Sequence, residues 1–233
     1  MPDLTRERAA VTISEIDRST TVDRVVAVLR QAMFDGDLVP GEPLREIPLS
    51  QKLRVGRSTI REALRALATD GLVQRLASRG LVVRNLTVAE IDDIFIARHF
   101  LECGAAKAAA SCPDAALETL RRAFEAYADA ADKADASQAA VAHVEFHGAM
   151  VALAGSQRLA EAERSMMRDL QLVITTIEKS SDDLPREIEK HRVLLDLFCQ
   201  RKVREVIAQI EIDLDHSRRF AVRNAADAHG VVF

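Results

Sequence analysis

The sequence is poor in aromatic side chains: it has no tryptophan, one tyrosine and eight phenylalanines among 233 residues. This scarcity excludes an aromatic platform on which the bases of single-stranded nucleic acid would stack. The three cysteines are Cys103, Cys112 and Cys199. Their odd number and wide spacing argue against a disulfide scaffold or a cysteine-based zinc site, and favour the reducing cytoplasm. No uncharged apolar run approaches the ~20 residues of a membrane span, and the N-terminus is too polar for a signal peptide.

Acidic residues outnumber basic ones, and the net charge is −4. The excess is uneven, however: residues 1–86 hold 14 Lys and Arg against 11 Asp and Glu, whereas residues 87–233 hold 18 against 25. Within 44–84, nine basic residues face three acidic ones, a local balance of +6. A basic segment joined to an acidic remainder predicts two functions on one chain.

Helical periodicity and turn residues predict a mainly α fold with two domains. The first is a winged helix-turn-helix with three helices and a β-hairpin wing, and the second is an all-α antiparallel helical bundle. We expect a flexible N-terminal arm at 1–19, the winged domain at 20–86, the bundle at 87–226 and a tail at 227–233. The expected elements are helices at 20–35, 46–53 and 58–70, strands at 72–76 and 81–84, and helices near 88–111, 114–133, 137–154, 157–180, 184–200 and 202–225.

Two helix starts have capping-box spacing. Thr59 is followed by Glu62, and Thr87 by Glu90, three residues on in each case. Ser58 or Thr59 is therefore predicted to cap the third helix, and Thr87 to open the bundle.

The third predicted helix has the composition of a helix that reads the major groove. Arginine forks onto guanine, while Ser, Thr and the N–H groups of a helix start suit phosphate oxygens. A glycine at the hairpin tip lets the wing approach the duplex. The candidate DNA contacts are Arg54, Arg57, Ser58, Thr59, Arg61, Arg65, Arg79 and Gly80. A solvated basic face on a protein-binding winged module is the alternative.

Several stretches of the winged segment resemble the GntR family of bacterial transcription regulators. They are Gly36–Gly41, the run VGRSTIREAL at 55–64, Leu67, and DGLV at 70–73. The helical remainder, with IFIAR at 94–98 and Leu101-Glu102, resembles the FCD ligand-sensing domain of that family's FadR branch. The resemblance implies a homodimer that reads a short palindrome in double-stranded DNA. Arg54, Gly56 and Thr59 depart from the usual residues there, which leaves the operator sequence open.

Three histidines and one aspartate fall on the apolar stripes of predicted bundle helices. His143 and His147 are four residues apart on one helix face, and His191 and Asp213 lie on two later helices. Such a set suits a divalent transition metal such as Zn, Ni or Mn. Polar core residues satisfied by hydrogen bonds are the alternative.

The FCD resemblance favours the metal. Metal-binding members place an Asp four residues before a His, then a His on each of two later helices. Here His147 and His191 match two of these positions, while His143 and Asp213 hold the other two with the residue types exchanged. His216, one turn beyond Asp213, is a reserve ligand. His99 points to a different helix face and is not expected to be a ligand, and His229 lies in the expected tail.

Arg98 lies on a buried stripe and needs an anion. The resemblance implies that it contacts a carboxylate of a small organic-acid effector; an internal ion pair with Glu102 or Glu145 is the alternative. The combined prediction is a cytoplasmic repressor, not an enzyme, that has no membrane contact. Two other functions stay open, a metal-free sensor of an acyl or other large ligand and a metallohydrolase.

Overall fold

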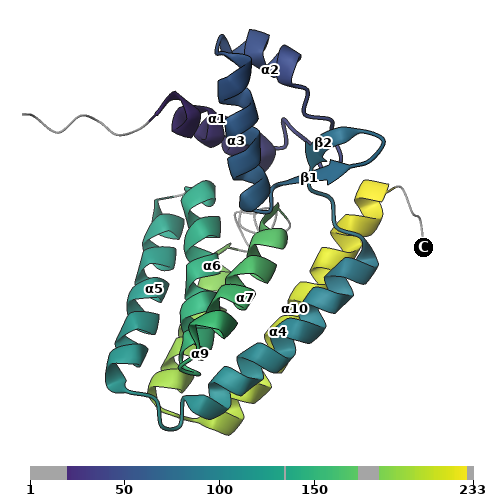
Figure 1. The fold of residues 1–233 in the computed structure, drawn as a ribbon. Coiled ribbons are helices and arrows are strands. Elements are labelled where there is room, and N and C mark those ends of the chain that lie inside the picture. Colours follow the sequence, from purple (N-terminus) through teal and green to yellow (C-terminus); the bar gives the residue numbers. More distant parts are fainter. Residues whose placement is uncertain (1–19, 134, 173–183, 230–233) are drawn as a thin grey trace, which may run out of the picture.

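A computed structural model describes residues 20–133, 135–172 and 184–229 of the chain. Figure 1 shows a small domain seated on one end of a helical bundle. The small domain contains α1 (Thr21–Asp35), α2 (Glu46–Leu53), α3 (Arg57–Thr69), β1 (Val73–Leu76) and β2 (Gly80–Val83). The bundle contains α4 (Val88–Ala108), α5 (Asp114–Asp132), α6 (Ala136–Ala152), α7 (Gln157–Asp169), α9 (Leu184–Cys199) and α10 (Val203–His229). The predicted winged helix-turn-helix and all-α bundle are confirmed.

The small domain is built around the apolar face of α3. Ile60, Ala63, Leu64 and Leu67 are all fully buried, which is the face that the spacing predicts. The antiparallel hairpin pairs Val73 with Val83 and closes at Leu76 and Gly80, so it lies over the same core. This packing leaves the opposite face of α3 exposed.

The start of α3 differs from the prediction. The helix begins at Arg57, and its N-cap is Gly56, which has no side chain to bond the first turn. Ser58 and Thr59 therefore lie inside the first turn instead of capping it. The N-terminal N–H groups of this helix have no side-chain cap, which keeps them accessible to an anion.

Thr87 opens α4 as predicted. Its hydroxyl accepts from the Glu90 N–H, and the Glu90 carboxylate accepts from the Thr87 N–H. The end of α7 differs from the expected helix at 157–180: α7 ends at Asp169 with Leu170 as its C-cap. No Gly or Pro marks this break in the sequence, and residues 173–180 lie outside the described residues. Helix α10 continues to His229, beyond the expected boundary at 226.

The two domains touch at one end of α6 and α7. Ala140, near the start of α6, is fully buried in the core of the small domain. A Cβ added to Gly71, just after α3, would lie 3.2 Å from the backbone carbonyl of Arg168 on α7. Arg84 reaches the carboxylate of Asp169 at 3.6 Å. Helices of the bundle thus extend directly into the base of the small domain.

No helix among the described residues is long and apolar enough to cross a membrane.

Candidate metal centre and nucleic-acid interface

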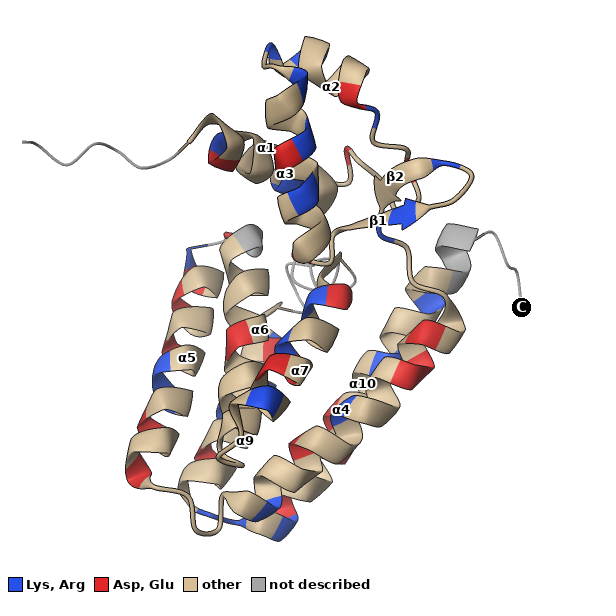
Figure 2. Cartoon of the chain, in the orientation of Figure 1, with Lys and Arg blue, Asp and Glu red and all other residues tan. Residues whose placement is uncertain are grey.

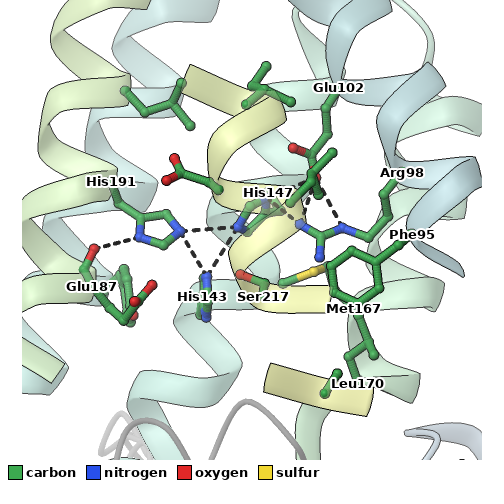
Figure 3. A pocket seen from close by; sticks show the side chains of 16 residues that line it. Phe95, Arg98, Glu102, His143, His147, Met167, Leu170, Glu187, His191 and Ser217 are labelled. Atoms are coloured by element: carbon green, nitrogen blue, oxygen red, sulfur yellow. Dashed lines mark hydrogen bonds and ion pairs between the residues drawn. The ribbon is translucent and has the colours of Figure 1, made fainter. Parts of the chain in front are cut away.

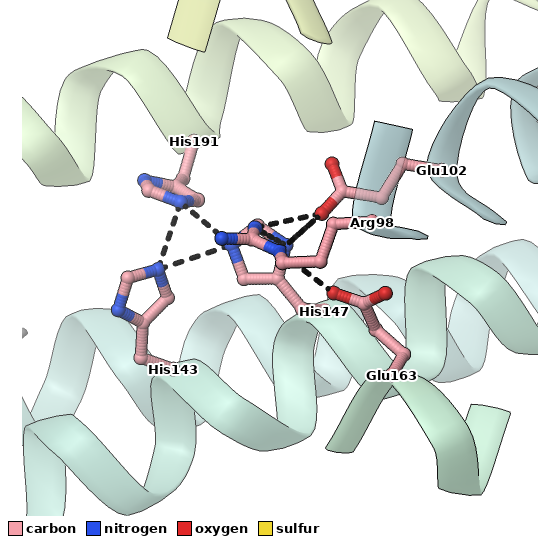
Figure 4. Close-up of polar contacts among 6 residues, drawn as sticks. All are labelled: Arg98, Glu102, His143, His147, Glu163 and His191. Atoms are coloured by element: carbon pink, nitrogen blue, oxygen red, sulfur yellow. Dashed lines mark hydrogen bonds and ion pairs between the residues drawn. The ribbon is translucent and has the colours of Figure 1, made fainter. Parts of the chain in front are cut away.

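Three of the four predicted metal ligands converge inside the bundle (Figures 3 and 4). His143 and His147 project from consecutive turns of α6, and His191 faces them from α9. All three are buried. Their Nε2 atoms form a triangle with sides of 3.1 Å (143–147), 3.0 Å (143–191) and 3.2 Å (147–191). The spacing of four residues in α6 is what puts two of the rings on one face.

Hydrogen bonds cannot account for this triangle. A ring nitrogen either carries a hydrogen and donates, or lacks one and accepts. In a triangle of such atoms, two must be of the same kind, so at least one of the three contacts is repulsive in every tautomer. A cation at the centre satisfies all three nitrogens at once. Nitrogens about 2.1 Å from one ion lie about 3.0 Å apart at right angles and about 3.4 Å apart at tetrahedral angles, a range that includes the observed sides.

Neighbouring groups hold the rings in the form that a metal requires. The Nδ1–H of His191 donates to the backbone carbonyl of Glu187 at 2.7 Å, which leaves its Nε2 lone pair available. Nδ1 of His147 lies 3.3 Å from a carboxylate oxygen of Glu102. Burial lowers the pKa of all three imidazoles, that of His191 to about 4. The rings are therefore neutral at pH 7, as metal ligands must be.

Asp213 lies on α10 and lines the same cavity, but its carboxylate is not part of the close cluster. It accepts a hydrogen bond from Gln209 at 3.0 Å, and burial raises its pKa. The structure thus brings three predicted ligands together and leaves the fourth at the cavity wall. His216 and His99 are absent from the residues that line this cavity. The side chain of His229 lies outside the described residues.

Arg98 forms an internal ion pair, which was named from the sequence as the alternative to a contact with an effector carboxylate. It is buried on α4, and its Nε donates to Glu102 and to Glu163, both at 3.0 Å. Its Nη2 donates to Glu102 at 2.7 Å and lies 3.3 Å from Nδ1 of His147 (Figure 4). The partners are Glu102 and Glu163; Glu145 instead accepts from Arg164. Among the described residues, no acceptor is bonded to Nη1 of Arg98.

The pKa values of the two carboxyl groups on Arg98 shift in opposite directions. Burial alone would raise the pKa of Glu102, but Arg98 and His147 lower it to about 2. Burial and the adjacent Glu102 charge raise the pKa of Glu163 well above its usual range. Glu102 is therefore ionised at pH 7, whereas the raised pKa of Glu163 favours its neutral form. The Glu102 charge offsets that of Arg98, so Arg98 alone supplies little surplus charge for an anionic ligand.

Two residues of the site were not singled out from the sequence. Glu163 is fully buried on the α7 stripe Ala160, Glu163, Met167. A charged residue on that apolar stripe was a readable signal. Tyr127, the chain's only tyrosine, stacks on the His143 ring with centroids 4.7 Å apart. Its place on the buried face of α5 is readable from periodicity, but its contact with His143 depends on how α5 packs against α6.

The predicted DNA contacts lie on α3, at the turn before it and at the tip of the hairpin. Figure 2 shows basic residues along α3 and near the turn between α2 and α3. Thr59 is half-buried, and the remaining candidates are exposed. Arg79 and Gly80 lie at the hairpin tip, as expected. Arg54 adopts a left-handed conformation, with φ of 54°, that ends α2.

Glu46 of α2 holds two of these arginines in the DNA-free chain. Its carboxylate accepts from Nε and Nη2 of Arg61 at 3.0 and 2.9 Å, and Nη2 of Arg57 lies 3.9 Å away. Arg61 is thus oriented before any duplex arrives. This pair could not be predicted from the sequence, because Glu46 and Arg61 belong to different helices.

Family models match both parts of the chain: "Bacterial regulatory proteins, gntR family" at residues 21–83 and "FCD domain" at residues 93–216. A probable D-xylose utilization operon transcriptional repressor from Paenarthrobacter nicotinovorans is 28% identical over 79% of this chain and 81% of its own. The Nta operon transcriptional regulator of Aminobacter aminovorans is 29% identical over 76% of this chain and 84% of its own.

Solved structures share the fold. A putative GntR transcriptional regulator from Rhodococcus sp. RHA1 superposes with a TM-score of 0.66 at 24% identity, over 92% of this chain and 100% of its own. Escherichia coli McbR/YncC superposes with a TM-score of 0.58 at 19% identity, over 91% and 98%. The family models and the two curated relatives indicate regulation of transcription, which removes the metallohydrolase alternative. This chain belongs to the gntR family of bacterial regulatory proteins, carries an FCD domain after its winged domain, and is a DNA-binding transcription regulator.

Proposed function

We propose that this regulator is a homodimeric repressor that binds a palindromic operator and is controlled by a small carboxylate held at a metal ion in the bundle. The observation that carries the proposal is the triangle of three neutral Nε2 atoms, since only a shared cation satisfies all of them. The repressor assignment is supported by the relative that is named a repressor.

The metal ligands in this proposal are His143, His147 and His191, with Asp213 on the remaining side of the ion. Zn, Ni and Mn all accept such a set. Glu102 acts as the outer partner that fixes the His147 ring. Asp213 supplies the one negative charge among three neutral ligands, so a divalent ion keeps a surplus positive charge that attracts an anion.

A small acid fits the space and the donors. The cavity beside the histidines measures about 50 Å³, which is room for a few atoms and too little for an acyl chain. In the proposal, the effector carboxylate fills an open coordination position and also accepts from Nη1 of Arg98. Glu102 keeps Arg98 pointing at the cavity, so the ion pair positions this donor for the ligand.

Two helices connect the cavity to the DNA-binding domain. Helix α6 carries His143 and His147 and also buries Ala140 in the small domain. Helix α7 carries Glu163 and meets Gly71 and Arg84 at its end. We infer that effector binding shifts these helices and re-aims the two winged domains of a dimer away from the half-site spacing. Coupling of this kind is typically about 1–3 kcal/mol.

On DNA, Arg57, Ser58, Arg61 and Arg65 of α3 are proposed to face the major groove, with Arg79 and Gly80 of the wing at the backbone or minor groove. Arg54 and Thr59 complete the set at the α2–α3 turn and the first turn of α3. Support comes from the exposure of all of these residues except half-buried Thr59, and from the uncapped start of α3.

Metal analysis of the purified full-length protein tests whether the three histidines bind a divalent ion. We expect about one divalent ion per chain at the histidine site, an increase in melting temperature when that ion is restored after chelation, and loss of both in His191→Gln. A chelated protein that melts at the same temperature with and without Zn, Ni or Mn would contradict this site and favour the metal-free sensor.

Sequence-specific DNA binding is tested on the duplex upstream of the chain's own gene. A random duplex of the same length is the control, and binding is measured over a range of salt concentrations. We expect a clear preference that Arg65→Ala reduces, since Arg65 is exposed and has no ion pair among the described residues. Equal affinity for both duplexes would contradict sequence-specific binding.

A further inference from the structure

A second cluster of ligand atoms lies on the other side of α4, facing α10. His99 and Cys103 are one turn apart on α4, and Glu211 approaches them from α10. The nearest ligand atoms of these residues all lie within 4.8 Å of one another. Figure 1 shows α4 and α10 running side by side, and a groove between them contains His99 and Glu211. None of these three side chains lines the histidine cavity.

The geometry suits a chelating pair with a third ligand. Nδ1 of His99 lies 3.9 Å from Sγ of Cys103. An ion about 2.3 Å from sulfur and about 2.05 Å from nitrogen places these atoms about 3.6 Å apart at a tetrahedral angle. Binding therefore needs only a small closure of two side chains on the same helix. A thiolate, an imidazole and a carboxylate together form a donor set typical of Zn²⁺.

The surroundings leave this cluster available. Among the described residues, no Lys or Arg forms an ion pair with Glu211, although the two acids nearest to it in the groove, Asp92 and Asp215, pair with Arg218 and Arg219. Glu211 is exposed, His99 half-buried and Cys103 buried, so an ion reaches the cluster from the side of Glu211 and His99. Burial, and then the Glu211 charge, raise the pKa of the Cys103 thiol. The thiol proton must therefore pass to solvent when a metal binds.

We propose that His99, Cys103 and Glu211 form a second, solvent-accessible site for a zinc-like divalent ion that bridges α4 and α10. The fourth position of the ion is open to water. Both bridged helices also line the histidine cavity, α4 with Arg98 and Glu102 and α10 with Asp213 and Ser217. An ion at the second site would restrict the movement of α4 relative to α10. The change of DNA affinity on effector binding would then depend on the concentration of available metal.

Cobalt absorption tests this site separately from the histidine centre. Co²⁺ bound to a thiolate gives a charge-transfer band in the near ultraviolet, and no cysteine lines the histidine cavity. Chelated, reduced full-length protein is titrated with Co²⁺ alone. We expect the band to saturate with one ion per chain bound at this site, to disappear in Cys103→Ser, and to yield to added Zn²⁺.

Three further variants complete the test. Glu211→Gln lies on the surface, keeps the fold and is expected to weaken Co²⁺ binding more than about tenfold. Cys199→Ser, which removes a different partly buried cysteine, and His191→Gln, which damages only the histidine centre, are expected to keep the band. Absence of the band in the unmodified protein, its loss in Cys199→Ser, or unchanged affinity in Glu211→Gln would overturn the proposal. Loss of metal in His191→Gln with the band intact would concern only the histidine centre.

Discussion

Ala140 and His143 lie one turn apart on α6, yet they belong to different parts of the molecule. Ala140 is buried in the core of the winged domain, whereas His143 faces the histidine cavity of the bundle. An α-helix is stiff over one turn, so a movement of the His143 backbone carries Ala140 with it. The sensing cavity and the DNA-binding domain therefore share one rigid element.

The first prediction concerns the contact of Gly71 with α7. In Gly71→Ala, the new methyl group meets the Arg168 carbonyl at 3.2 Å, and the residue keeps a φ of +76°. We expect a loss of about 1–2 kcal/mol in unfolding free energy from the backbone alone, and in addition an altered change of operator affinity on effector or metal binding. Both are measured by urea denaturation and DNA titration.

The matched control is Gly36→Ala. Gly36 has a similar φ of +80°, but a Cβ there meets no atom within 4 Å. The backbone cost is expected to be the same, with the DNA response unchanged. If the two variants respond alike to the ligand, the Gly71 contact does not transmit the signal.

The second prediction separates the two carboxyl groups on Arg98. The pKa of Glu163 is raised well above its usual range, so Glu163→Gln, which puts a neutral group of similar shape there, should change the unfolding free energy by no more than about 1 kcal/mol. Glu102→Gln removes the carboxylate whose pKa Arg98 lowers, and buried Arg98 then keeps an ionised partner only if Glu163 gives up its proton, so this variant should cost more, up to about 3–5 kcal/mol. Urea denaturation at pH 7 measures both. Equal losses would mean that the proton is shared differently.

The sequence predicted most of the fold because the signals are local. Helix periodicity located α1 to α6, and the Thr87 capping box located the start of α4. The break after Asp169 was missed, since the chain there has no Gly or Pro to mark it. The N-cap of α3 was assigned to the wrong residue. Ser58 and Thr59 have good capping chemistry, but the helix already begins at Arg57, directly after Gly56.

For the site, the sequence could predict which side chains point inward but not which of them meet. His143 and His147 are fixed by spacing in one helix, and they are together as expected. Asp213 also points inward, but the distance from α10 to the three rings depends on tertiary packing. The partners of Arg98 show the same limit: Glu102 is one turn away and was named, whereas Glu163 lies on α7, 65 residues further along the chain.

The third prediction concerns Glu46, whose carboxylate holds Arg61 in the DNA-free protein. Glu46→Gln removes a negative charge from the DNA-binding face and releases Arg61 and Arg57. We expect tighter binding to random duplex and a smaller ratio between operator and random affinities, because Arg61 is no longer oriented. Fluorescence anisotropy over a range of salt concentrations measures both. Glu62→Gln removes one exposed negative charge from the same helix as Arg61 and is the control for charge alone. If Glu62→Gln lowers the ratio of operator to random affinity as much as Glu46→Gln does, Glu46 does not orient Arg61.

The last prediction follows from the buried imidazoles. Burial lowers the pKa of His191 to about 4 in the folded chain and lowers those of His143 and His147 as well, whereas an unfolded histidine titrates near 6.5. Between these values the unfolded chain binds protons that the folded chain does not. The three imidazoles therefore make the metal-free protein lose stability as the pH falls from 6.5 toward 4, and the raised pKa values of Glu163 and Asp213 offset part of that loss.

Urea denaturation of the chelated protein between pH 4 and pH 7.5 measures this slope. His191→Gln removes one titrating group and should make the slope shallower, and a substitution of His216, which does not line the cavity, is the control. Added metal should steepen the loss below pH 6.5, since protons then compete with the ion for the same nitrogens. A metal-free protein with equal stability at pH 5 and pH 7 would show that the three rings are not buried in the neutral form.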